Sequence, residues 1–434
     1  MIGVLGLGRE TRELLAVLDR DEPGAEVVVV DERAIDPAQL PATPQLRTHL
    51  AAPVDLDDPA ALPDGLTTIY RSPGVSPYRA AVAAAIRQGV ATTTPTGRWA
   101  AGRDNADVVA VTGTKGKSTT AAMAAHLLRA AGHRVELLGN IGRSALSAGP
   151  APPADTIVLE LSSYQLVDLP ARLGLGGITT LLSDHVPWHG SLARYHADKL
   201  RLLTLADRVI LDPAVAAHPS VRTVLDDAAS APTAVTTSVA HARLRPALES
   251  AGLIGEHLVR DAALALALTD ARLASAVGLA DLADALAGFR PLPHRLTPVR
   301  TLHEVTWVDD SISTVPESAV AAARTYLARG PVTLLLGGDD RGQDPGPLAA
   351  LLADPQVRAV LLPPLGERWA EALAEVAGPR IHRAADLDEA VQIAARHTPE
   401  GGAVLLSPAA PSFSAYRDFT ARGEHFTRLV AALA

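Results

Sequence analysis

Residues 112–120 read T-G-T-K-G-K-S-T-T and combine glycine, lysine and hydroxyl side chains at a spacing that suits a bound phosphate. Gly113 and Gly116 permit close approach of the backbone to phosphate oxygens. Lys117 can neutralise phosphate charge, and Ser118 can bind magnesium. The spacing G-x-x-G-K-[ST]-T is shorter than the general phosphate-loop pattern, which leaves a glycine turn and an ordinary helix capped by Ser118 as the alternative.

The neighbouring sequence supplies the elements that such a loop requires. Residues 107–111 are mostly apolar and predict a strand, while Ala121–Ala131 is rich in alanine and leucine and predicts a helix. Unpaired N–H groups and the positive end of the helix dipole would then converge on a phosphate. We therefore predict a nucleoside triphosphate site.

Two further predicted strands carry possible metal ligands. Thr156–Leu161 is apolar and β-branched, and Glu160 near its C-terminal end can bind magnesium or a water on it. The alternative for Glu160 is a solvent-facing position on an edge strand. Residues 178–182 predict another strand, which runs into S-D-H-V-P-W-H-G-S and brings His185 and His189 together. Such a pair suits a second divalent ion, or else forms a solvated turn.

A helix is predicted over Tyr195–Leu200, and it would direct Lys199 toward the core. A buried lysine is costly as a cation, so it is paired, deprotonated or chemically altered. A deprotonated amine can take up carbon dioxide and become a metal-binding carbamate, although the residue pattern alone does not predict this.

The first segment begins I-G-V-L-G-L-G, an apolar run that meets Gly6 and Gly8. A helix is predicted from Glu10 to Leu18, and a second strand from Glu26 to Val30 is followed by Asp31. This βαβ outline with an acidic residue after its second strand predicts a Rossmann-like nucleotide site.

The ligand of that first site is less defined. Thr11 stands where G-x-G-x-x-G has its third glycine, which disfavours a dinucleotide. A nucleotide diphosphate bound in another way is the favoured interpretation, and a tight turn without a ligand is the alternative. Residues 72–75, S-P-G-V, follow another apolar strand and can donate backbone hydrogen bonds to a phosphate or a sugar.

A third segment begins near Val299. Strand Val332–Leu336 runs into G-G-D-D-R-G-Q-D, and strand Ala403–Leu406 runs into S-P-A-A-P-S-F-S-A-Y-R-D-F. These junctions predict a second Rossmann-like sheet that binds its ligand at the carboxyl ends of its strands. Arg341 can grip a carboxylate with two hydrogen bonds, or else is a solvated loop arginine. The proline- and glycine-rich segment Gly288–Pro298 is a predicted hinge.

Composition limits the class of protein. The chain has 434 residues, 48% of them hydrophobic, no cysteine and a formal charge of −9. It therefore contains no disulfide and no thiolate metal site, and its charge argues against a nucleic-acid partner. We found no membrane-spanning stretch and expect a soluble cytoplasmic protein. The predicted fold is α/β with three domains: Rossmann-like 1–95, central phosphate-loop 96–298 and Rossmann-like 299–434.

The motifs together resemble a known family. T-G-T-K-G-K-S-T, L-E-L-S-S-Y-Q-L, D-H-V-P-W-H-G-S, Y-x-x-x-K and P-H-R occur in the order found in the Mur ligases of peptidoglycan precursor synthesis, and most resemble the glutamate-adding, MurD-type members. The resemblance covers nearly the whole chain. It implies ATP-driven amide synthesis through an acyl phosphate, with magnesium as cofactor, two divalent ions, and manganese as a possible substitute. The implied substrates are UDP-N-acetylmuramoyl-L-alanine and glutamate.

The resemblance also implies roles for individual residues. Lys117, Asn140, Glu160, His185 and Lys199 would lie at the reacting centre, and Lys199 would be the carbamylated lysine. The metal ligands would be Ser118, Glu160, His185 and the Lys199 carbamate. ATP would contact Gly113, Thr114, Lys115, Gly116, Lys117, Ser118, Thr119, Arg295 and Asp310. The UDP-linked substrate would contact Gly8, Arg9, Glu10, Asp31, Arg33, Ser72, Asn140, Ser162, Gln165 and Tyr195. Glutamate would contact Thr314, Arg341, Ser412 and Phe419.

Some residues depart from the family pattern. Where D-glutamate enzymes usually read N-D-S-K-A-T-N, residues 309–315 read D-D-S-I-S-T-V, so Ile312 replaces a lysine, and Arg341 replaces another. The local pattern resembles the subfamily that adds L-glutamate and leaves inversion to a separate epimerase; D-glutamate is the alternative. Further departures that affect the nucleotide and metal motifs are Pro187, Leu258 and Asp261.

Other classes of protein remain as alternatives. A folylpolyglutamate synthetase would share the central motifs but lack a UDP-type first domain, and residues 1–93 argue against it. A small-molecule kinase would have no reason to carry Lys199 and the C-terminal loops. A non-catalytic nucleotide-binding regulator would be expected to lose Lys117, Glu160 or Lys199, all of which are present. The family suggests a monomer, and no heptad repeat contradicts it.

Overall fold

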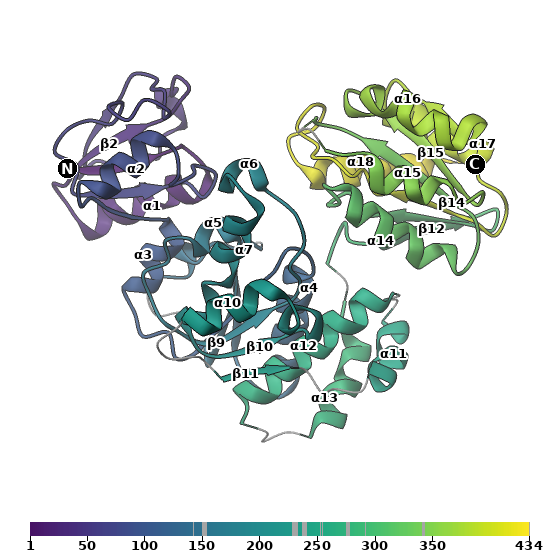
Figure 1. Cartoon of the computed structure of the whole chain (residues 1–434), viewed down its shortest axis with the longest axis horizontal. Coiled ribbons are helices and arrows are strands. Elements are labelled where there is room, and N and C mark those ends of the chain that lie inside the picture. Colours follow the sequence, from purple (N-terminus) through teal and green to yellow (C-terminus); the bar gives the residue numbers. More distant parts are fainter. Residues whose placement is uncertain are drawn as a thin grey trace. The chain divides into compact units, whose positions relative to one another are not determined.

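The chain contains three β-sheets, which the computed structural model shows with their covering helices (Figure 1). It describes residues 1–141, 143–149, 154–227, 233–236, 241–251, 253, 255–274, 278–290, 292–340 and 343–433. The chain forms two compact units, one of Met1–Ala251 with His257–Phe289 and one of Gly252–Glu256 with Arg290–Ala434. The division at Phe289 lies within the predicted hinge segment. No helix of the described residues is both long and apolar enough to cross a bilayer.

The first sheet is entirely parallel and has the order β3-β2-β1-β4-β5. Its strands are β1 (Ile2–Leu5), β2 (Glu26–Val30), β3 (Arg47–Leu50), β4 (Thr68–Arg71) and β5 (Ala91–Thr93), and its helices are α1 (Arg9–Asp21) and α2 (Ala80–Arg87). The predicted βαβ start is confirmed. Thr11 closes the turn before α1, since its hydroxyl donates to the Gly6 carbonyl (2.7 Å) and accepts from the Gly8 amide (2.8 Å).

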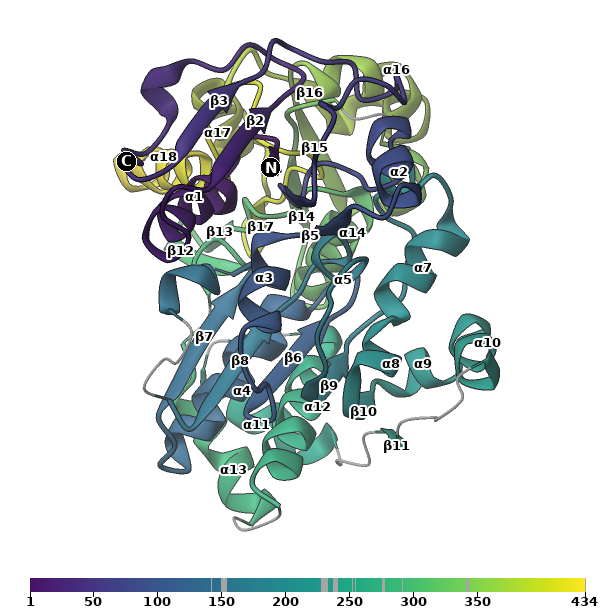
Figure 2. The same cartoon turned by 90° about the vertical axis from the view of Figure 1, so that its left-hand side faces the viewer.

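The second sheet is also parallel, with the order β11-β10-β9-β6-β8-β7. Figure 2 shows β7, β8, β6, β9 and β10 side by side in this order. The strands are β6 (Val108–Thr112), β7 (Val135–Gly139), β8 (Thr156–Glu160), β9 (Leu173–Ile178), β10 (Ala206–Leu211) and β11 (Thr233–Thr236). Helix α4 (Lys117–Ala130) follows β6 after a short loop and packs against β6, β7 and β8.

One predicted strand is misplaced. The expected strand at 178–182 is wrong, because β9 ends at Ile178 and the following residues form a loop. The observed strand reads L-G-L-G-G-I, and so many glycines are more typical of a loop than of a strand. A Cβ at Gly174 would collide with the backbone of Ala106, and one at Gly177 would crowd Leu268. Glycine is therefore required by close packing on both sides of this strand.

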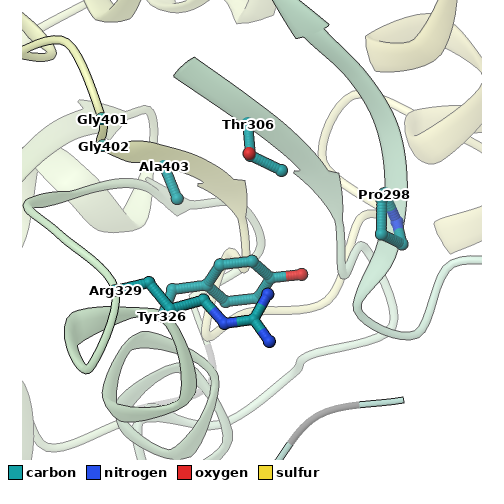
Figure 3. A pocket seen from close by; sticks show the side chains of 7 residues that line it. All are labelled: Pro298, Thr306, Tyr326, Arg329, Gly401, Gly402 and Ala403. Atoms are coloured by element: carbon teal, nitrogen blue, oxygen red, sulfur yellow. The ribbon is translucent and has the colours of Figure 1, made fainter. Parts of the chain in front are cut away.

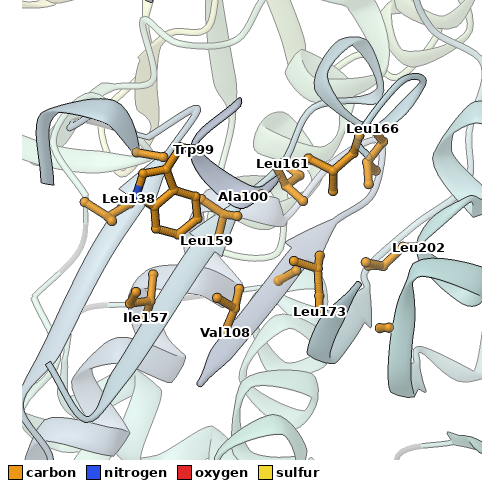
Figure 4. Packing of buried hydrophobic residues seen from close by; sticks show 14 of the residues in the cluster. Trp99, Ala100, Val108, Leu138, Ile157, Leu159, Leu161, Leu166, Leu173 and Leu202 are labelled. Atoms are coloured by element: carbon orange, nitrogen blue, oxygen red, sulfur yellow. The ribbon is translucent and has the colours of Figure 1, made fainter. Parts of the chain in front are cut away.

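The core that packs against the second sheet is mainly aliphatic (Figure 4). Helix α3 (Pro95–Ala101) lays Trp99 and Ala100 over strand residues that include Val108, Ile157 and Leu159. The remaining helices of this part of the chain are α5 (Ser163–Leu166), α6 (Val186–His189), α7 (Leu192–Leu200), α8 (Leu202–Leu205), α9 (Pro213–Ala216), α10 (Pro219–Asp227), α11 (His241–Ser250), α12 (Glu256–Arg272) and α13 (Leu279–Ala285).

A buried arginine joins the first sheet to the segment that follows β8. Arg71, at the end of β4, has a fully buried side chain whose Nε and Nη2 donate to the two carboxylate oxygens of Asp168 at 2.6 and 2.8 Å. Nη2 also donates to the Tyr164 carbonyl at 2.6 Å, and Nη1 to the Val75 carbonyl at 3.0 Å. These bonds satisfy the guanidinium inside the protein and fix the two sheets of the first unit to each other.

The third sheet belongs to the second unit and has the order β12-β13-β17-β14-β15-β16. Its strands are β12 (Thr297–Leu302), β13 (Val305–Asp309), β14 (Val332–Gly337), β15 (Val357–Leu362), β16 (Ile381–Arg383) and β17 (Ala403–Leu406). Only β12 among these is antiparallel to its neighbour.

Both faces of the third sheet are covered by helices. Helices α14 (Pro316–Leu327), α15 (Gly346–Leu352) and α16 (Leu365–Ala377) bury one face, where Leu334 and Leu405 point. Helices α17 (Leu387–His397) and α18 (Phe419–Ala432) bury the other, where Leu335 and Val404 point. This alternation is the pattern of a doubly covered parallel sheet, so the predicted Rossmann-like fold is confirmed.

A small cavity of about 90 Å³ lies at the amino ends of β13 and β17 (Figure 3). Thr306, Tyr326 and Arg329 line it together with Gly401 and Gly402. The predicted ligand loops follow the carboxyl ends of the same strands, so this cavity is on the opposite edge of the sheet from the predicted glutamate site.

Candidate active site

The phosphate loop has the conformation that the sequence predicts. Helix α4 begins at Lys117, directly after Gly116, which has φ of 85° and caps the helix in the left-handed region. Gly113 has φ of 146°, and a Cβ there would collide with the Thr179 side chain. A Cβ at Gly116 would collide with the Asp261 carboxylate. A side chain at either position would therefore clash within the protein itself, and the predicted approach of a phosphate to these glycines stays a prediction.

A ring of hydrogen bonds holds this loop in place. The Thr114 hydroxyl accepts from the Tyr195 hydroxyl and from the Leu182 amide, each at 3.0 Å. The Lys115 amide donates to the Thr180 hydroxyl at 2.8 Å, and the Lys115 amine lies 3.4 Å from the Asp184 carboxylate. The loop after β9 thus supports the phosphate loop through both backbone and side chains.

Lys199 lies directly beneath the phosphate loop. Its side chain is buried, and Nζ donates to the Gly113 carbonyl at 2.7 Å. Burial, and secondarily the charge of Lys117, lowers the Lys199 pKa well below its ordinary value. The amine is therefore readily deprotonated, which is the chemical condition for a carbamate; the carbamate itself stays a prediction.

Glu160 ends β8 next to the same loop and is fully buried. Its Oε1 accepts from the Asn140 amide at 3.0 Å, whereas Oε2 has no hydrogen-bond partner within the described part of the chain. A buried carboxylate oxygen without a partner is costly, and a divalent cation would satisfy it. The edge-strand alternative for Glu160 is excluded, because β8 lies between β6 and β7.

The residues present fit a magnesium ion that keeps several non-protein ligands. No group of three or more His, Asp or Glu side chains among the described residues forms a closed cage for a metal. Magnesium usually takes one or two carboxylates and completes its shell with water and substrate phosphates. Glu160 and Ser118, which is 7% exposed in the first turn of α4, suit that arrangement.

His185 is held in a form that can bind a metal. It has φ of 51°, a left-handed backbone that is uncommon outside glycine, and it precedes α6. Its Nδ1 lies 2.9 Å from the Tyr164 hydroxyl. Partial burial of the ring, whose side chain is still 46% exposed, lowers the His185 pKa to about 4, against the attraction of Asp184. The imidazole is therefore neutral near pH 7, and Nε2 can serve as a ligand.

His189 has a different environment, so the idea that the two histidines bind one ion is wrong. His189 is fully buried; its Nε2 lies 3.0 Å from the Ser163 hydroxyl and its Nδ1 lies 2.6 Å from Asp198. Both ring nitrogens are occupied by protein groups. The sequence spacing could not reveal this, because Ser163 is 26 positions away from His189.

The predicted UDP-substrate residues fall into two groups. Gly8, Asp31 and Ser72 lie at the carboxyl ends of the first parallel strands, where Asp31 accepts from the Leu7 and Arg33 amides at 2.9 and 3.1 Å. Arg9 and Arg33 are exposed there, and Asn140 is exposed near Glu160.

The second group is engaged inside the protein. Glu10 is 9% exposed and accepts from Gln165 and Thr96, each at 3.1 Å. Ser162 caps α5, and Tyr195 is fully buried under the phosphate loop. Contact of these residues with a UDP-linked substrate stays a prediction, since their polar groups already join parts of the first unit.

The predicted C-terminal residues lie in the second unit. Asp310 is 7% exposed, and its carboxylate accepts from the Ser407 hydroxyl (2.6 Å) and the Leu296 amide (3.2 Å). Burial raises the Asp310 pKa to about 7. Thr314 and Phe419 are half-buried, Ser412 is 3% exposed and Arg295 is half-buried. Arg341 lies outside the described residues.

Arg422 organises these C-terminal loops, and the sequence did not suggest it. Its guanidinium donates to the carbonyl and hydroxyl of Ser311 at 2.7 and 3.0 Å and to the Ala410 carbonyl at 3.0 Å. Burial lowers the Arg422 pKa to about 10. Its spacing from Phe426 and Val430, which places all three on the buried side of α18, is the signal that could have identified it.

The fold and the phosphate loop together define an α/β nucleotide-binding protein of the phosphate-loop class. Residues 111–244 match the Mur ligase middle domain, and residues 294–410 match the Mur ligase, glutamate ligase domain. The UDP-N-acetylmuramoyl-L-alanine–L-glutamate ligase of Xanthomonas euvesicatoria is 40% identical over 83% of this chain and 81% of its own. The enzyme of that name from Micromonospora sp. is 37% identical over 99% and 96%.

Solved structures share the fold at low sequence identity. The UDP-N-acetylmuramate-alanine ligase MurC from Thermotoga maritima aligns with a TM-score of 0.58 at 16% identity and covers 99% of both chains. The MurF ligase from the same organism aligns with a TM-score of 0.60 at 14% identity over 100% of this chain and 95% of its own. The chain belongs to the Mur ligase family. It is accordingly an ATP-dependent amino-acid ligase of peptidoglycan precursor synthesis.

Proposed function

We propose that this ligase joins L-glutamate to UDP-N-acetylmuramoyl-L-alanine in the cytoplasm with hydrolysis of ATP. The relatives that carry this activity in their names are similar over nearly the full chain. The product would contain an L-glutamyl residue, so an epimerase would act after it where D-glutamate is needed. We propose the three domains 1–95, 96–298 and 299–434, and a monomeric state.

The observation that carries the ligase chemistry is the set of buried charged groups around the phosphate loop. Lys199 and Glu160 are both buried. Lys199 donates a hydrogen bond to the Gly113 carbonyl, and Glu160 accepts one from the Asn140 side chain. A nucleotide kinase needs the loop and a carboxylate but has no use for a buried lysine with a lowered pKa beneath it. The carbamate of Lys199 would convert this group into an anionic ligand for a second divalent ion.

Phosphoryl transfer would come first. The terminal carboxylate of the UDP-linked substrate attacks the γ-phosphorus of ATP, and the bond to the leaving ADP oxygen breaks to give an acyl phosphate. Ser118 and Glu160 would hold magnesium, which would neutralise charge on the phosphates when bound. Lys117, in the first turn of α4, would supply a further positive charge. The backbone amides of the phosphate loop and of the start of α4 would orient the phosphates.

Amide formation would follow. The deprotonated amine of glutamate attacks the acyl carbon, and the tetrahedral intermediate expels phosphate to leave the amide. His185 has a pKa lowered to about 4, so it is a poor proton acceptor near neutral pH and is better suited to hold a metal than to act as the general base. Thr314, Arg341, Ser412 and Phe419 are the residues that we propose for glutamate binding.

The choice of L-glutamate rests on the names of the relatives and on the loop of residues 309–315. That loop has Ile312 in place of a lysine and Ser313 in place of an alanine, which changes both charge and hydrogen bonding next to Thr314. The Ser313 hydroxyl is buried and has no partner among the residues described. D-glutamate is the second candidate, because Asp310, Ser311 and Thr314 agree with the pattern N-D-S-K-A-T-N of D-glutamate enzymes.

Phosphate release with ATP, magnesium and UDP-N-acetylmuramoyl-L-alanine tests the proposal, with L- and D-glutamate compared under identical conditions. We expect release with L-glutamate, and none from Lys117→Ala, which removes the charge opposite the γ-phosphate. Release only with D-glutamate would establish the second candidate and leave Ile312 as a neutral replacement. No release with either enantiomer would contradict the proposed substrates.

A further inference from the structure

Three hydrogen bonds link four side chains from separate segments of the first unit. The Tyr78 hydroxyl donates to Asp198 Oδ1 at 2.6 Å, His189 Nδ1 lies 2.6 Å from Asp198 Oδ2, and His189 Nε2 lies 3.0 Å from the Ser163 hydroxyl. A carboxylate only accepts, so Nδ1 of His189 carries the hydrogen. Ser163, His189 and Asp198 are 1%, 0% and 6% exposed. We call these four side chains the Tyr78 relay.

The relay is not a nucleophile site, although a serine, a histidine and an aspartate follow one another in it. A nucleophilic serine must reach its substrate, and the Ser163 side chain is closed off from solvent. The carboxylate of Asp198 also accepts a second bond from Tyr78, which fixes the group from the side opposite His189. The arrangement therefore holds elements together.

One end of the relay lies on residues 72–78, the loop after β4. This loop is joined to α6 by two more bonds: Trp188 Nε1 donates to the Gly74 carbonyl and the Ser76 hydroxyl donates to the Trp188 carbonyl, each at 2.9 Å. The Tyr164 ring stacks on Trp188 with centroids 4.1 Å apart. The loop that we propose to contact the UDP-linked substrate is thus connected directly to α6.

The other end lies among the groups of the phosphate site. Asp198 immediately precedes Lys199 in α7, so the carboxylate fixes the turn that carries the buried amine. His189 ends the single helical turn α6 that starts after His185. Ser163 begins α5, and the next residue, Tyr164, places its hydroxyl 2.9 Å from His185. Ser163, His189 and Asp198 therefore each adjoin a candidate metal ligand or its support.

We propose that Tyr78 and His189 are positioning residues that make nucleotide binding at the phosphate loop depend on occupation of the 72–78 loop by the UDP-linked substrate. The inference rests on the proposed function. A substrate that orders residues 72–78 fixes the Tyr78 hydroxyl, and through Asp198 and His189 it fixes the turns that carry Lys199 and His185. Ser163, His189 and Asp198 are buried, so the hydrogen bonds among these three allow few alternative geometries, whereas Tyr78 is 37% exposed on the substrate-loop side.

Coupling of this kind is measurable as a ratio of affinities. The dissociation constant of a magnesium complex of a non-hydrolysable ATP analogue is measured by calorimetry without and with saturating UDP-N-acetylmuramoyl-L-alanine. We expect the substrate to tighten analogue binding by roughly 5-fold or more in the wild-type protein. In Tyr78→Phe the ratio should fall toward 1, while the analogue alone should bind with nearly unchanged affinity.

Tyr70→Phe is the matched control. The Tyr70 hydroxyl also joins the first sheet to the following segment, where it accepts from Arg98 of α3 at 2.9 Å, but it makes no contact with the relay. We expect the wild-type ratio in this variant. A ratio that falls equally in Tyr70→Phe and Tyr78→Phe would overturn the relay, because general loosening between the two sheets would then explain both.

His189 provides an independent test, because two replacements of this residue retain different numbers of its hydrogen bonds. His189→Asn can keep a donor toward Asp198, whereas His189→Ala keeps neither bond. We expect partial coupling in the asparagine variant, loss of coupling in the alanine variant, and a lower kcat in both with a smaller change in the KM for glutamate. Identical ratios in wild type and both variants would overturn the inference.

The outcomes separate this inference from the proposed function. A wild-type protein that releases phosphate with glutamate, but whose Tyr78→Phe variant keeps the full affinity ratio, contradicts only the relay. A wild-type protein that binds the ATP analogue but shows no response to UDP-N-acetylmuramoyl-L-alanine, and releases no phosphate with it, contradicts the proposed function and the relay together.

Discussion

Buried charged groups beside the phosphate loop of the first unit differ from those at the strand ends of the second unit in how fully they are hydrogen-bonded. Around the phosphate loop, Glu160 keeps a carboxylate oxygen without a partner in the described chain. At the C-terminal strand ends, Asp310 accepts two hydrogen bonds and Arg422 makes bonds to two loops. Unsatisfied groups mark where a ligand completes a site, and satisfied groups mark where the protein holds its own loops.

Glu160→Gln gives the largest expected effect on the first side of this comparison. The change removes the charge of a carboxylate that has one oxygen without a partner in the described chain, so activity should fall about 100-fold or more while the thermal midpoint is unchanged or higher. Phosphate release and a thermal melt measure the two quantities. A loss of stability of several degrees would mean that Glu160 is a structural group, and the comparison would fail.

Lys199→Ala should lose activity to a similar extent, about 100-fold, if a carbamate binds metal there. A short carboxylic acid added to the buffer should restore part of the activity, because it supplies the missing anionic oxygens. Lys117→Ala is the control, since a lost cation cannot be replaced by an acid. Equal absence of rescue in both variants, with both proteins folded, would argue against the carbamate.

Arg422→Ala tests the second side. Removal of the guanidinium leaves the Ser311 and Ala410 carbonyls buried without their donor, which should cost roughly 3 kcal/mol of stability. Arg417→Ala is a suitable comparison, because the Arg417 side chain is 77% exposed and should contribute within about 0.5 kcal/mol. Chemical denaturation measures both. Similar stabilities for the two variants would show that Arg422 does not hold the loops.

Asp310 should make the stability of the second unit depend on pH. Its folded pKa of about 7 lies above the ordinary 3.8, so between these values the folded state binds more protons than the unfolded state. Stability from this group should therefore fall as pH rises from about 4 to about 7. Asp310→Asn should flatten that dependence in thermal midpoints taken at pH 5 and pH 8. Parallel pH profiles for wild type and variant would contradict the raised pKa.

Ser313→Ala should have the smallest effect on stability, and this effect should be opposite in sign to that of Ser311→Ala. The Ser313 hydroxyl lacks a partner in the described chain, so its removal should leave stability equal or up to about 1 kcal/mol higher, while the KM for glutamate rises. Ser311→Ala removes a hydroxyl that donates to the Phe419 carbonyl at 2.8 Å and should destabilise the protein. The opposite order of stabilities would place the ligand-facing hydroxyl at Ser311.

The sequence predicts elements well where local pattern and chemistry agree. The strands at Glu26–Val30 and Ala403–Leu406 have the predicted bounds, and the phosphate loop lies between a strand and a helix, as predicted. Strand β9 was misplaced because its glycines are selected by packing against Ala106 and Leu268, and neither neighbour is visible in local sequence.

The partners of individual side chains were the harder part of the site. His189 and His185 are alike in sequence, yet one is enclosed by Ser163 and Asp198 and the other adjoins Asp184 and Tyr164. Such differences depend on contacts between segments that only the folded chain brings together. Glu160 and Lys199 could be identified because a carboxylate at a strand end and a lysine on a core-facing helix position are unusual in themselves.

The buried ion pair of Arg71 and Asp168 limits which domains can be exchanged between members of the family. Its guanidinium is fully enclosed and its fork fits the two oxygens of Asp168. A foreign first domain grafted at residue 95 without an arginine at this place would leave a lone carboxylate inside the chimera, and a foreign middle domain without the aspartate would leave a lone cation. Both halves of the pair must therefore be transferred together for a hybrid enzyme to fold.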